Sequence, residues 1–310
     1  MLVVVALGGN ALLRRGQPLD AAVQRGNVRA AAEGLAALAR EHQVVLTHGN
    51  GPQVGLLALQ NASFGGADPY PLDVLGAETE GMVGYLLEQE LARHLGEGKV
   101  ATLLTQVVVD SDDPAFARPT KFVGPVYDQA EAERVGALRH WTIAPDGDAW
   151  RRVVPSPEPR RIVELVTIRL LVEHNVTVVC AGGGGIPVVP SFDGGLVGVE
   201  GVIDKDLSAA LLATALGADA LVLLTDVDAV YAGYGTPQAR PLHTATVAEL
   251  RALRLPAGSM GPKVEAVCRF VEAGGRYGAI GNLDDAVAVC RGQSGTVVSC
   301  GTITTGHGAC

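Results

Sequence analysis

Two glycine turns, each at the end of a short apolar run, most constrain what this chain can fold into. Gly8-Gly9-Asn10 follows the run Leu2–Leu7, and His48-Gly49-Asn50-Gly51 follows Val44–Leu46. Each turn leads into a segment with a helical pattern. Amide N–H groups at a helix start carry partial positive charge, and glycine lets a ligand approach them closely. We therefore predict that two strand ends converge on one small anionic ligand, which is typical of an enzyme.

Apolar runs rich in β-branched residues alternate with helical patterns along most of the chain. In Asp20–Glu41, for example, apolar residues fall on one helical face. Continuous apolar strands between helices indicate a mostly parallel sheet covered on both faces, so the predicted fold is α/β, a three-layer αβα sandwich. The predicted strands are Leu2–Leu7, Val44–Leu46, Leu103–Val109, Val176–Cys180, Leu221–Leu224 and Thr296–Ser299.

Two stretches interrupt this alternation. Residues from about 118 to 159 are proline-rich and polar, and Trp141–Ile143 and Trp150–Val154 flank a Pro-Asp-Gly turn, which predicts a hairpin. We interpret this stretch as a small protruding subdomain or lid, with an ordinary surface excursion as the alternative. A glycine- and proline-rich seam at Ile186–Val202 predicts a division into an N-terminal lobe, residues 1–190, and a C-terminal lobe, residues 191–310.

Composition excludes several classes of function. The 310 residues carry a net charge of −9 without a lysine or arginine block, so no nucleic-acid partner is expected. The apolar runs are too short to cross a bilayer, and no export signal is visible, so we expect a cytoplasmic protein without a membrane partner. The five cysteines form no C-x-x-C pair, which favours buried free thiols over a disulfide framework or a zinc site.

The common nucleotide-binding motifs are missing. The P-loop pattern G-x-x-x-x-G-K-[ST] does not occur, and the dinucleotide pattern G-x-G-x-x-G does not follow the first strand. Gly182–Gly185 comes after a strand, but Ile186-Pro187 stands where a helix start is needed. A nicotinamide enzyme and a P-loop NTPase are therefore disfavoured.

Three lysines stand in unusual surroundings. Lys121 begins the polar insertion, Lys205 lies between Asp204 and Asp206 just before a helical segment, and Lys263 lies in the first turn of a helix. A lysine in a first turn opposes the helix dipole, which makes sense if it reaches a phosphate. The alternative for each lysine taken alone is an ordinary solvated side chain.

Aspartates accompany these lysines. Asp204 and Asp206 are placed to pair with lysine, and Asp206 is also placed to cap the following helix. Asp226 and Asp228 end a buried strand, where ligands bind in open α/β sheets. His48, beside a glycine turn, is interpreted as a hydrogen-bonded scaffold residue. The sequence has glycine turns in one part and lysines with strand-end aspartates in another. This combination predicts phosphoryl transfer without a P-loop, because that reaction needs positioning of the substrates and positive charge around the migrating group.

The chain resembles carbamate kinases over nearly its whole length. The matching segments run collinearly, which is more specific than any lone glycine motif. They are Val5–Leu12, Gln24–Arg29, Thr47–Gly55, Pro119–Lys121, Gly124-Pro125, Val154–Pro159, Ala181–Val188, Val202–Asp206, Leu224–Val227 and Gly258–Val264. The resemblance implies the amino-acid-kinase fold, a homodimer, Mg²⁺ with ATP or ADP, and reversible exchange between ATP plus carbamate and ADP plus carbamoyl phosphate.

The resemblance also implies roles for individual residues. Lys121 would fold over the acceptor pocket from the subdomain, Lys205 would stabilise the migrating phosphoryl group, and Asp206 would orient the lysines. The pocket for carbamate and the transferred phosphate would consist of Gly8, Gly9, Asn10, Gly49, Asn50 and Gly51. The nucleotide would be bound by Lys205, Asp226, Tyr231, Met260, Gly261 and Lys263. Mg²⁺ would be held mainly through the nucleotide phosphates rather than by protein ligands.

Two other functions remain open from the sequence. One is a kinase of the same fold that acts on an acylamino acid or a nucleoside monophosphate, with a larger acceptor pocket. The other is a non-enzymatic nucleotide sensor on the same scaffold, which would have no need of Lys121, Lys205 and Lys263.

Overall fold

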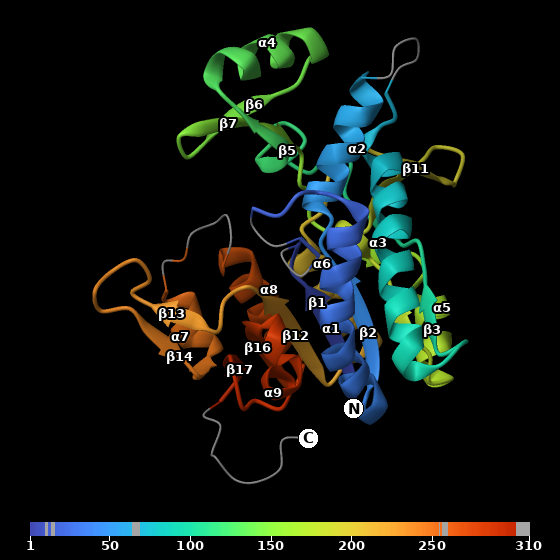
Figure 1. Cartoon of the computed structure of the whole chain (residues 1–310), viewed down its shortest axis with the longest axis vertical. Coiled ribbons are helices and arrows are strands. Elements are labelled where there is room, and N and C mark those ends of the chain that lie inside the picture. Colours follow the sequence, from blue (N-terminus) through green and yellow to red (C-terminus); the bar gives the residue numbers. More distant parts are fainter. Residues whose placement is uncertain (10–11, 14–15, 64–68, 254, 256–259, 302–310) are drawn as a thin grey trace.

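A large twisted sheet runs through the centre of the molecule (Figure 1). The computed structural model describes residues 1–9, 12–13, 16–63, 69–253, 255 and 260–301. Within these residues the sheet has eight strands. In hydrogen-bonding order they are β15 (Thr244–Thr246), β17 (Thr296–Ser299), β16 (Tyr277–Asn282), β12 (Ala220–Thr225), β1 (Leu2–Leu7), β2 (Gln43–His48), β9 (Thr177–Val179) and β3 (Val100–Thr102).

The direction of the strands agrees with the predicted parallel sheet. β1 pairs in parallel with β2 and β12, and β9 pairs in parallel with β2 and β3. β16 and β17 run antiparallel. The register places Leu7 opposite both His48 and Leu224, so the residues that follow β1, β2 and β12 lie at one edge of the sheet. This edge is where an α/β sheet binds ligands.

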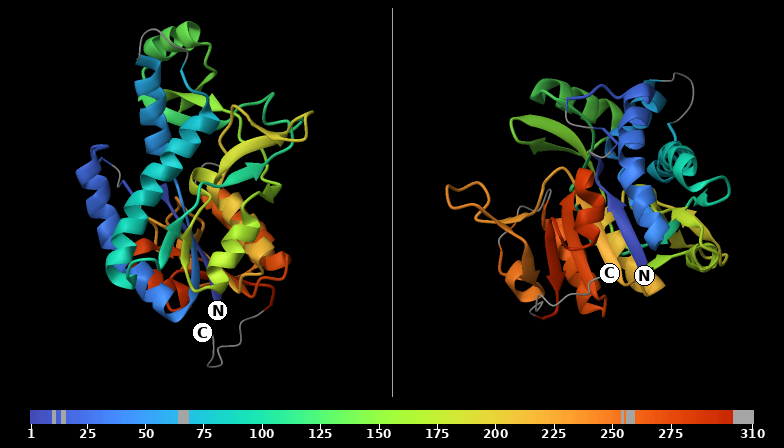
Figure 2. Two further views of the ribbon diagram at one scale, coloured as in Figure 1. Left: turned by 90° about the vertical axis from the view of Figure 1, so that its right-hand side faces the viewer. Right: turned by 60° about the horizontal axis from the view of Figure 1, so that its bottom comes forward.

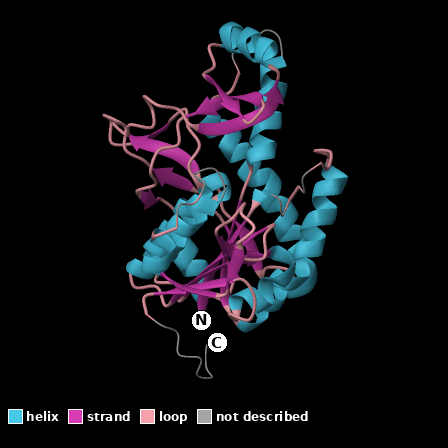
Figure 3. Cartoon of the chain, turned by 90° about the vertical axis from the view of Figure 1, so that its left-hand side faces the viewer, coloured by secondary structure: helices cyan, strands magenta, loops and turns pink. Residues whose placement is uncertain are grey.

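Helices cover both faces of this sheet, as Figure 3 shows. Val3 and Val5 of β1 pack with one set of helices, whereas Val4 and Ala6 pack with the other, because successive side chains of a strand point to opposite faces. The first set is α1 (Ala21–Glu41), α3 (Leu72–Leu95) and α9 (Ala286–Cys290). The second set is α5 (Leu165–Glu173), α6 (Lys205–Leu216), α7 (Val247–Arg251) and α8 (Met260–Glu272). The predicted three-layer α/β fold is confirmed.

A small subdomain projects from one end of the molecule (Figures 1 and 2). It consists of a three-stranded sheet of β5 (Lys121–Tyr127), β7 (Ala149–Val154) and β6 (Ile143–Asp146), with α4 (Gln129–Arg139) beside it. β6 and β7 form the hairpin expected from the sequence. The N-terminus lies at the opposite end of the molecule.

The subdomain packs against α2 (Gly51–Ser63), the helix that follows the second glycine turn. A Cβ atom at Gly55 would lie 2.6 Å from the Gly124 Cα atom, so the two backbones touch where a side chain has no room. Gly124 has φ +75°, which favours glycine at this position. Val54, Val123 and Val154 are buried in the adjoining apolar cluster.

The predicted strand Leu103–Val109 is wrong in one respect, because the chain changes sheets inside it. β3 ends at Thr102, and β4 (Gln106–Val108) belongs to a second sheet. The Leu103 N–H donates to Val179 O in the first sheet, whereas the Thr105 carbonyl accepts from Ile186 N in the second. The second sheet has the order β11 (Leu196–Gly198), β10 (Ile186–Pro190), β4 and β8 (Arg161–Ile162). The predicted seam at Ile186–Val202 thus contains the β10–β11 hairpin.

Other expectations also need correction. α1 begins only at Ala21, capped by Asp20, so the first glycine turn does not lead directly into it. β16 was not expected, because its two glycines interrupt the apolar pattern; a Cβ atom at Gly278 would lie 2.8 Å from the Val267 Cβ atom of α8. Cys180, Cys268 and Cys290 are buried as predicted, but Cys300 is exposed. Cys310 lies outside the described residues.

Smaller elements complete the description. Thr246 and Glu249 form a capping box at the start of α7. β13 (Val230–Ala232) and β14 (Arg240–Leu242) form a two-stranded sheet, and two short 3₁₀ helices are η2 (Gly182–Gly184) and η3 (Leu283–Asp285). Among the described residues, no helix is both long and apolar enough to cross a membrane.

We expect Gly55→Ala to push the subdomain away from α2, because the added methyl group would meet the Gly124 backbone. Hydrogen–deuterium exchange should accelerate in β5 and stay unchanged in the central strand β12. The control is Gly26→Ala, a helical glycine with nothing within 4 Å of an added Cβ atom. That change should stabilise the fold by roughly 0.5–1 kcal/mol. Unchanged exchange in β5 would show that the Gly55–Gly124 contact does not hold the subdomain.

Candidate functional site

The two glycine turns meet at the carboxyl ends of β1 and β2. The Gly8 N–H donates to Leu224 O at 2.7 Å, and the Gly49 N–H donates to Leu7 O at 3.0 Å. A Cβ atom at Gly49 would lie 3.0 Å from Gly9 N and 3.4 Å from Lys205 Cδ. Only glycine allows this approach, so the convergence expected from the sequence is present, with a lysine stem against it. Asn10 lies outside the described residues.

Asp206 holds two of the predicted lysines. The Lys205 Nζ atom donates to one carboxylate oxygen of Asp206, and Lys263 Nζ donates to the other at 3.1 Å. The Asp206 side chain is only 4% exposed. Burial alone would raise the pKa of Asp206, but the charges of Lys205 and Lys263 outweigh it and lower the pKa to about 2. Burial lowers the pKa of Lys205, and the Asp206 charge opposes that change.

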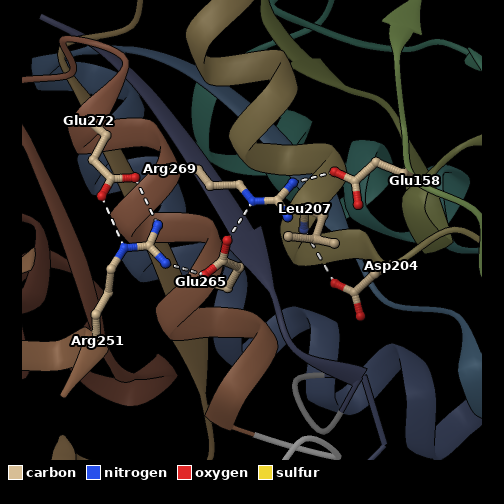
Figure 4. Close-up of polar contacts among 7 residues, drawn as sticks. All are labelled: Glu158, Asp204, Leu207, Arg251, Glu265, Arg269 and Glu272. Atoms are coloured by element: carbon tan, nitrogen blue, oxygen red, sulfur yellow. Dashed lines mark hydrogen bonds and ion pairs between the residues drawn. The ribbon is translucent and has the colours of Figure 1, made fainter. Parts of the chain in front are cut away.

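Asp204, and not Asp206, caps α6. Its Oδ1 atom accepts from the N–H groups of Asp206 and Leu207, at 3.0 and 3.3 Å; the second of these bonds is drawn in Figure 4. The expectation that Asp206 fills the cap is therefore wrong, because Asp206 lies inside the first turn and turns its carboxylate to the lysines. The other Asp204 oxygen, Oδ2, pairs with Lys121 Nζ at 2.6 Å. The structure thus brings Lys121, Lys205 and Lys263 together around two adjacent aspartates.

The lysines reach this cluster from distant parts of the chain. Lys121 is the first residue of β5 in the subdomain, Lys205 opens α6, and Lys263 lies in the first turn of α8. Because α6 and α8 pack side by side, Asp206 is within reach of both helices. Positive charge that is scattered in an acidic sequence is therefore concentrated beside the glycine turns.

Ion pairs brace α8, the helix that carries Lys263 (Figure 4). Arg251 of α7 pairs with Glu265 at 2.9 Å and with Glu272 at 2.8 Å. Arg269 pairs with Glu265 at 2.7 Å and also with Glu158, in the segment that leaves the subdomain. These partly exposed pairs link α7, α8 and the end of the insertion, although each exposed pair contributes little stability by itself.

The remaining residues predicted for the nucleotide lie near the carboxyl ends of the strands. Asp226 is exposed directly after β12 and accepts a hydrogen bond from Thr225 Oγ1 at 3.1 Å. Tyr231 of β13 donates to Asp228 at 3.0 Å. Met260 and Gly261 open α8 and are partly exposed.

Sequence reasoning missed the polar layer beneath the pocket. Asn50 Nδ2 donates to Thr79 Oγ1 of α3 at 2.8 Å, and a Cβ atom at Gly183 would overlap the Asn50 amide. Thr79 and Glu80 are polar residues buried among the apolar residues of α3. His48 is fully buried, and that burial lowers its pKa to about 4, which agrees with a neutral scaffold residue.

The site is suited to a metal that arrives with an anion. Among the residues that the structure describes, no group of three or more His, Cys, Asp or Glu side chains is placed to hold a metal ion. Three lysines would repel a bare cation but would attract phosphate groups that carry one. Chemically, the cluster can bind and stabilise a phosphoryl group next to the glycine turns.

Comparisons with known proteins agree with this geometry. The amino acid kinase family matches residues 1–282. Carbamate kinase from Rhizobium meliloti is 55% identical over 96% of this chain and 93% of its own length. The carbamate kinase of Haemophilus influenzae is 50% identical over 96% of this chain and 97% of its own length. The structure of a Giardia lamblia carbamate kinase bound to AMP-PNP matches with a TM-score of 0.88 and 40% identity, covering 96% of this chain and 98% of the other.

We expect Asp206→Asn to destabilise the fold by roughly 3–5 kcal/mol at neutral pH, because two largely buried ammonium groups lose their partner. The pKa of Asp206 is lowered on folding, to about 2. Its stabilisation is therefore complete above the unfolded pKa, about 3.9, and declines as pH falls towards the folded value.

The measurement is urea unfolding of both proteins between about pH 7 and about pH 2.5. The stability gap between wild type and Asp206→Asn should narrow as pH falls, by about 2 kcal/mol at most. The exposed Asp112→Asn serves as the control, with a small gap at every pH. A gap for Asp206→Asn that is constant with pH would contradict the ion-pair assignment.

Proposed function

Because this chain belongs to the amino acid kinase family, we propose that it acts as a carbamate kinase, exchanging ATP and carbamate for ADP and carbamoyl phosphate. The observation that carries the proposal is the lysine cluster beside two touching glycine turns. Phosphoryl transfer asks little covalent chemistry of the protein. It requires in-line positioning of the reacting groups and positive charge around the migrating group, and the lysine cluster supports the second requirement.

The acceptor side of the reaction is assigned to the glycine turns. A carbamate ion is small and anionic, and backbone N–H groups at the start of α2 offer it hydrogen bonds and partial positive charge. The absence of Cβ atoms at Gly9 and Gly49 lets it approach the backbone. The proposed acceptor residues are Gly8, Gly9, Asn10, Gly49, Asn50 and Gly51.

The charged residues take the phosphoryl group and the nucleotide. Lys205 lies against Gly49 and is proposed to stabilise the migrating phosphoryl group, with Asp206 orienting Lys205 and Lys263. Lys121 is proposed to close over the pocket from the subdomain, exchanging its contact with Asp204 for one with substrate. The proposed nucleotide residues are Lys205, Asp226, Tyr231, Met260, Gly261 and Lys263.

We further propose a division of labour along the chain. Residues 1–190 would bind the acceptor and residues 191–310 the nucleotide, although both parts contribute strands to one sheet. β1, β2, β3 and β9 come from the first part, and β12, β15, β16 and β17 from the second. The acceptor and the nucleotide would therefore meet where β1 lies beside β12.

Mg²⁺, a homodimer and a cytoplasmic location complete the proposal. Mg²⁺ is usually bound through substrate phosphates with few protein ligands, and this fits a site built from lysines. The metal would supply charge neutralisation between the phosphates. The homodimer and the cytoplasmic location rest on the resemblance to carbamate kinases.

The other candidate functions have less support. A sensor has no use for three lysines held by ion pairs around an acceptor pocket. A kinase for an acylamino acid or a nucleoside monophosphate needs a larger acceptor site, whereas here the Gly9 and Gly49 backbones touch and Gly183 packs against Asn50.

The direct test is ATP formation from ADP, Mg²⁺ and carbamoyl phosphate, read by a luciferase assay. We expect ATP to form, to depend on Mg²⁺, and to fail when acetyl phosphate or N-acetylglutamyl phosphate replaces carbamoyl phosphate. Folded protein that makes no ATP from fresh carbamoyl phosphate would overturn the assignment. Equal or better use of an acylamino-acid phosphate would favour the alternative kinase.

Two lysine variants separate the proposed roles. Lys205→Ala should lower kcat by roughly 10²–10³, the usual cost of removing one preorganised charge-stabilising donor. Lys121→Ala should impair carbamoyl phosphate turnover strongly while ADP affinity, measured by calorimetry, changes little. The exposed Lys99→Ala is the control for the loss of a positive charge. If Lys121→Ala lost ADP affinity and kept carbamoyl phosphate turnover, Lys121 would belong to the nucleotide site instead.

A further inference from the structure

Two adjacent side chains of α3 are buried beneath the acceptor pocket, and no role in the reaction has been given to them. Thr79 is 0% exposed and Glu80 is 2% exposed. Buried polar groups cost free energy unless they are hydrogen-bonded, so the partners of these two side chains indicate what they hold in place. Thr79 bonds to Asn50 of the second glycine turn and to Gly76 O of its own helix, and Glu80 bonds to Thr105 N.

Thr79 determines which way the Asn50 amide faces. The Thr79 hydroxyl donates its single proton to Gly76 O at 2.8 Å, so its oxygen can only accept from Asn50. The Asn50 NH₂ group must therefore face Thr79, at 2.8 Å, and the amide oxygen must face away from it. Asn50 immediately precedes α2 in the second glycine turn, so this bond sets an orientation inside the pocket.

Glu80 holds the loop on which Asn50 rests. Its Oε2 atom accepts from Thr105 N at 2.7 Å, and a Cβ atom at Gly182 would lie 3.0 Å from Glu80 Cγ, so Glu80 also packs closely against this loop. Thr105 in turn accepts from Ala181 N at 2.9 Å through its hydroxyl oxygen. Ala181 and Gly183 adopt left-handed backbone conformations, with φ of 49° and 66°, so this loop needs outside contacts to keep its shape.

The loop and the pocket are in van der Waals contact without spare room. A Cβ atom at Gly182 would overlap the His48 ring, and one at Gly183 would overlap the Asn50 amide. His48 and Asn50 flank Gly49, whose backbone lies against Gly9. A displacement of the loop therefore moves the side chains on both sides of the second glycine turn.

We propose that Thr79 and Glu80 are positioning residues for the acceptor pocket: Thr79 orients the Asn50 amide, and Glu80 anchors the Ala181–Gly185 loop that supports it. The inference rests on the proposed function for the identity of the acceptor. Burial raises the pKa of Glu80, and its Oε2 atom holds the loop by accepting from Thr105 N.

The first test compares Thr79→Val, which keeps the shape and removes the hydroxyl, with Thr79→Ser, which keeps the hydroxyl. Thr79→Val should lower kcat/KM for carbamoyl phosphate by roughly tenfold to a hundredfold, because misplacement of a binding group by about 1 Å costs that much. The KM for ADP should stay within about twofold, and Thr79→Ser should recover most of the loss. Thr177→Val removes a buried hydroxyl at the opposite end of the sheet and serves as the control.

The second test addresses Glu80 and the loop. Glu80→Gln keeps a hydrogen-bond acceptor of nearly the same size and should remain within about threefold of wild type, whereas Glu80→Leu should resemble Thr79→Val. Equal loss in Glu80→Gln and Glu80→Leu would overturn the anchoring role of the Glu80 hydrogen bond. If the KM values for ADP and for carbamoyl phosphate changed by the same factor in these variants, Thr79 and Glu80 would have only a general structural role.

A readout without turnover keeps this inference separate from the proposed function. The ¹⁵N-labelled side-chain amide of Asn50, assigned by its loss in Asn50→Ala, should shift in Thr79→Val and in Glu80→Leu but not in Thr177→Val. Should wild type lack kinase activity yet show these shifts, the proposed function fails and the positioning role stands. An Asn50 resonance unchanged in both variants would disprove the positioning role, whatever the substrate.

Discussion

The site depends on one buried carboxylate placed between two ammonium groups. Lysines as buried as Lys205 and Lys263 would be costly without a counter-charge, and Asp206 supplies it to both. A single negative charge between two positive ones leaves a net positive charge in the pocket. An incoming phosphoryl group would neutralise that excess positive charge. The ion pairs that stabilise the buried lysines therefore also leave the site able to bind an anion. The positions of α6 and α8 follow from this constraint, since both helices must bring a first turn to Asp206.

Close backbone contacts are the second constraint. An added Cβ atom at Gly49 would lie 3.0 Å from Gly9 N, where two strand ends approach, and one at Gly55 would lie 2.6 Å from Gly124 Cα, where the subdomain reaches α2. α2 begins at the second glycine turn, so one helix connects the pocket to the subdomain that carries Lys121. Glycine is therefore required in two places: where the ligand must approach the backbone, and where the subdomain must come near the site.

The main features of the fold could be predicted from the sequence because its signals are local. The apolar run of β1 and the hairpin of the subdomain each depend on a few neighbouring residues. β16 gave no such signal, because its glycines interrupt the apolar pattern; Gly278 is required there by its contact with Val267 of α8. The run from Leu103 to Val109 was predicted as one strand because hydrophobic pattern does not reveal a change of sheet at Thr105. Likewise, the cap of α6 was assigned to Asp206, since spacing alone cannot tell which of two aspartates turns towards the helix and which turns towards lysine.

The sequence could not predict the part of the site that depends on contacts between residues far apart in the chain. Motifs pointed to the glycine turns and the three lysines, but the Asn50 orientation comes from Thr79, 29 residues away on another helix. Electrostatics also distinguishes the layer of Thr79 and Glu80 from the lysine–aspartate cluster. An ionised carboxylate at Glu80 would lie in a low-dielectric region, where its field would reach the lysines with little screening. Burial disfavours that ionised form by raising the pKa of Glu80, whereas the charges of Lys205 and Lys263 lower the pKa of Asp206 to about 2. Two buried carboxyl groups thus act differently: Asp206 supplies charge between the lysines, and Glu80 accepts a hydrogen bond from the Thr105 backbone behind the pocket.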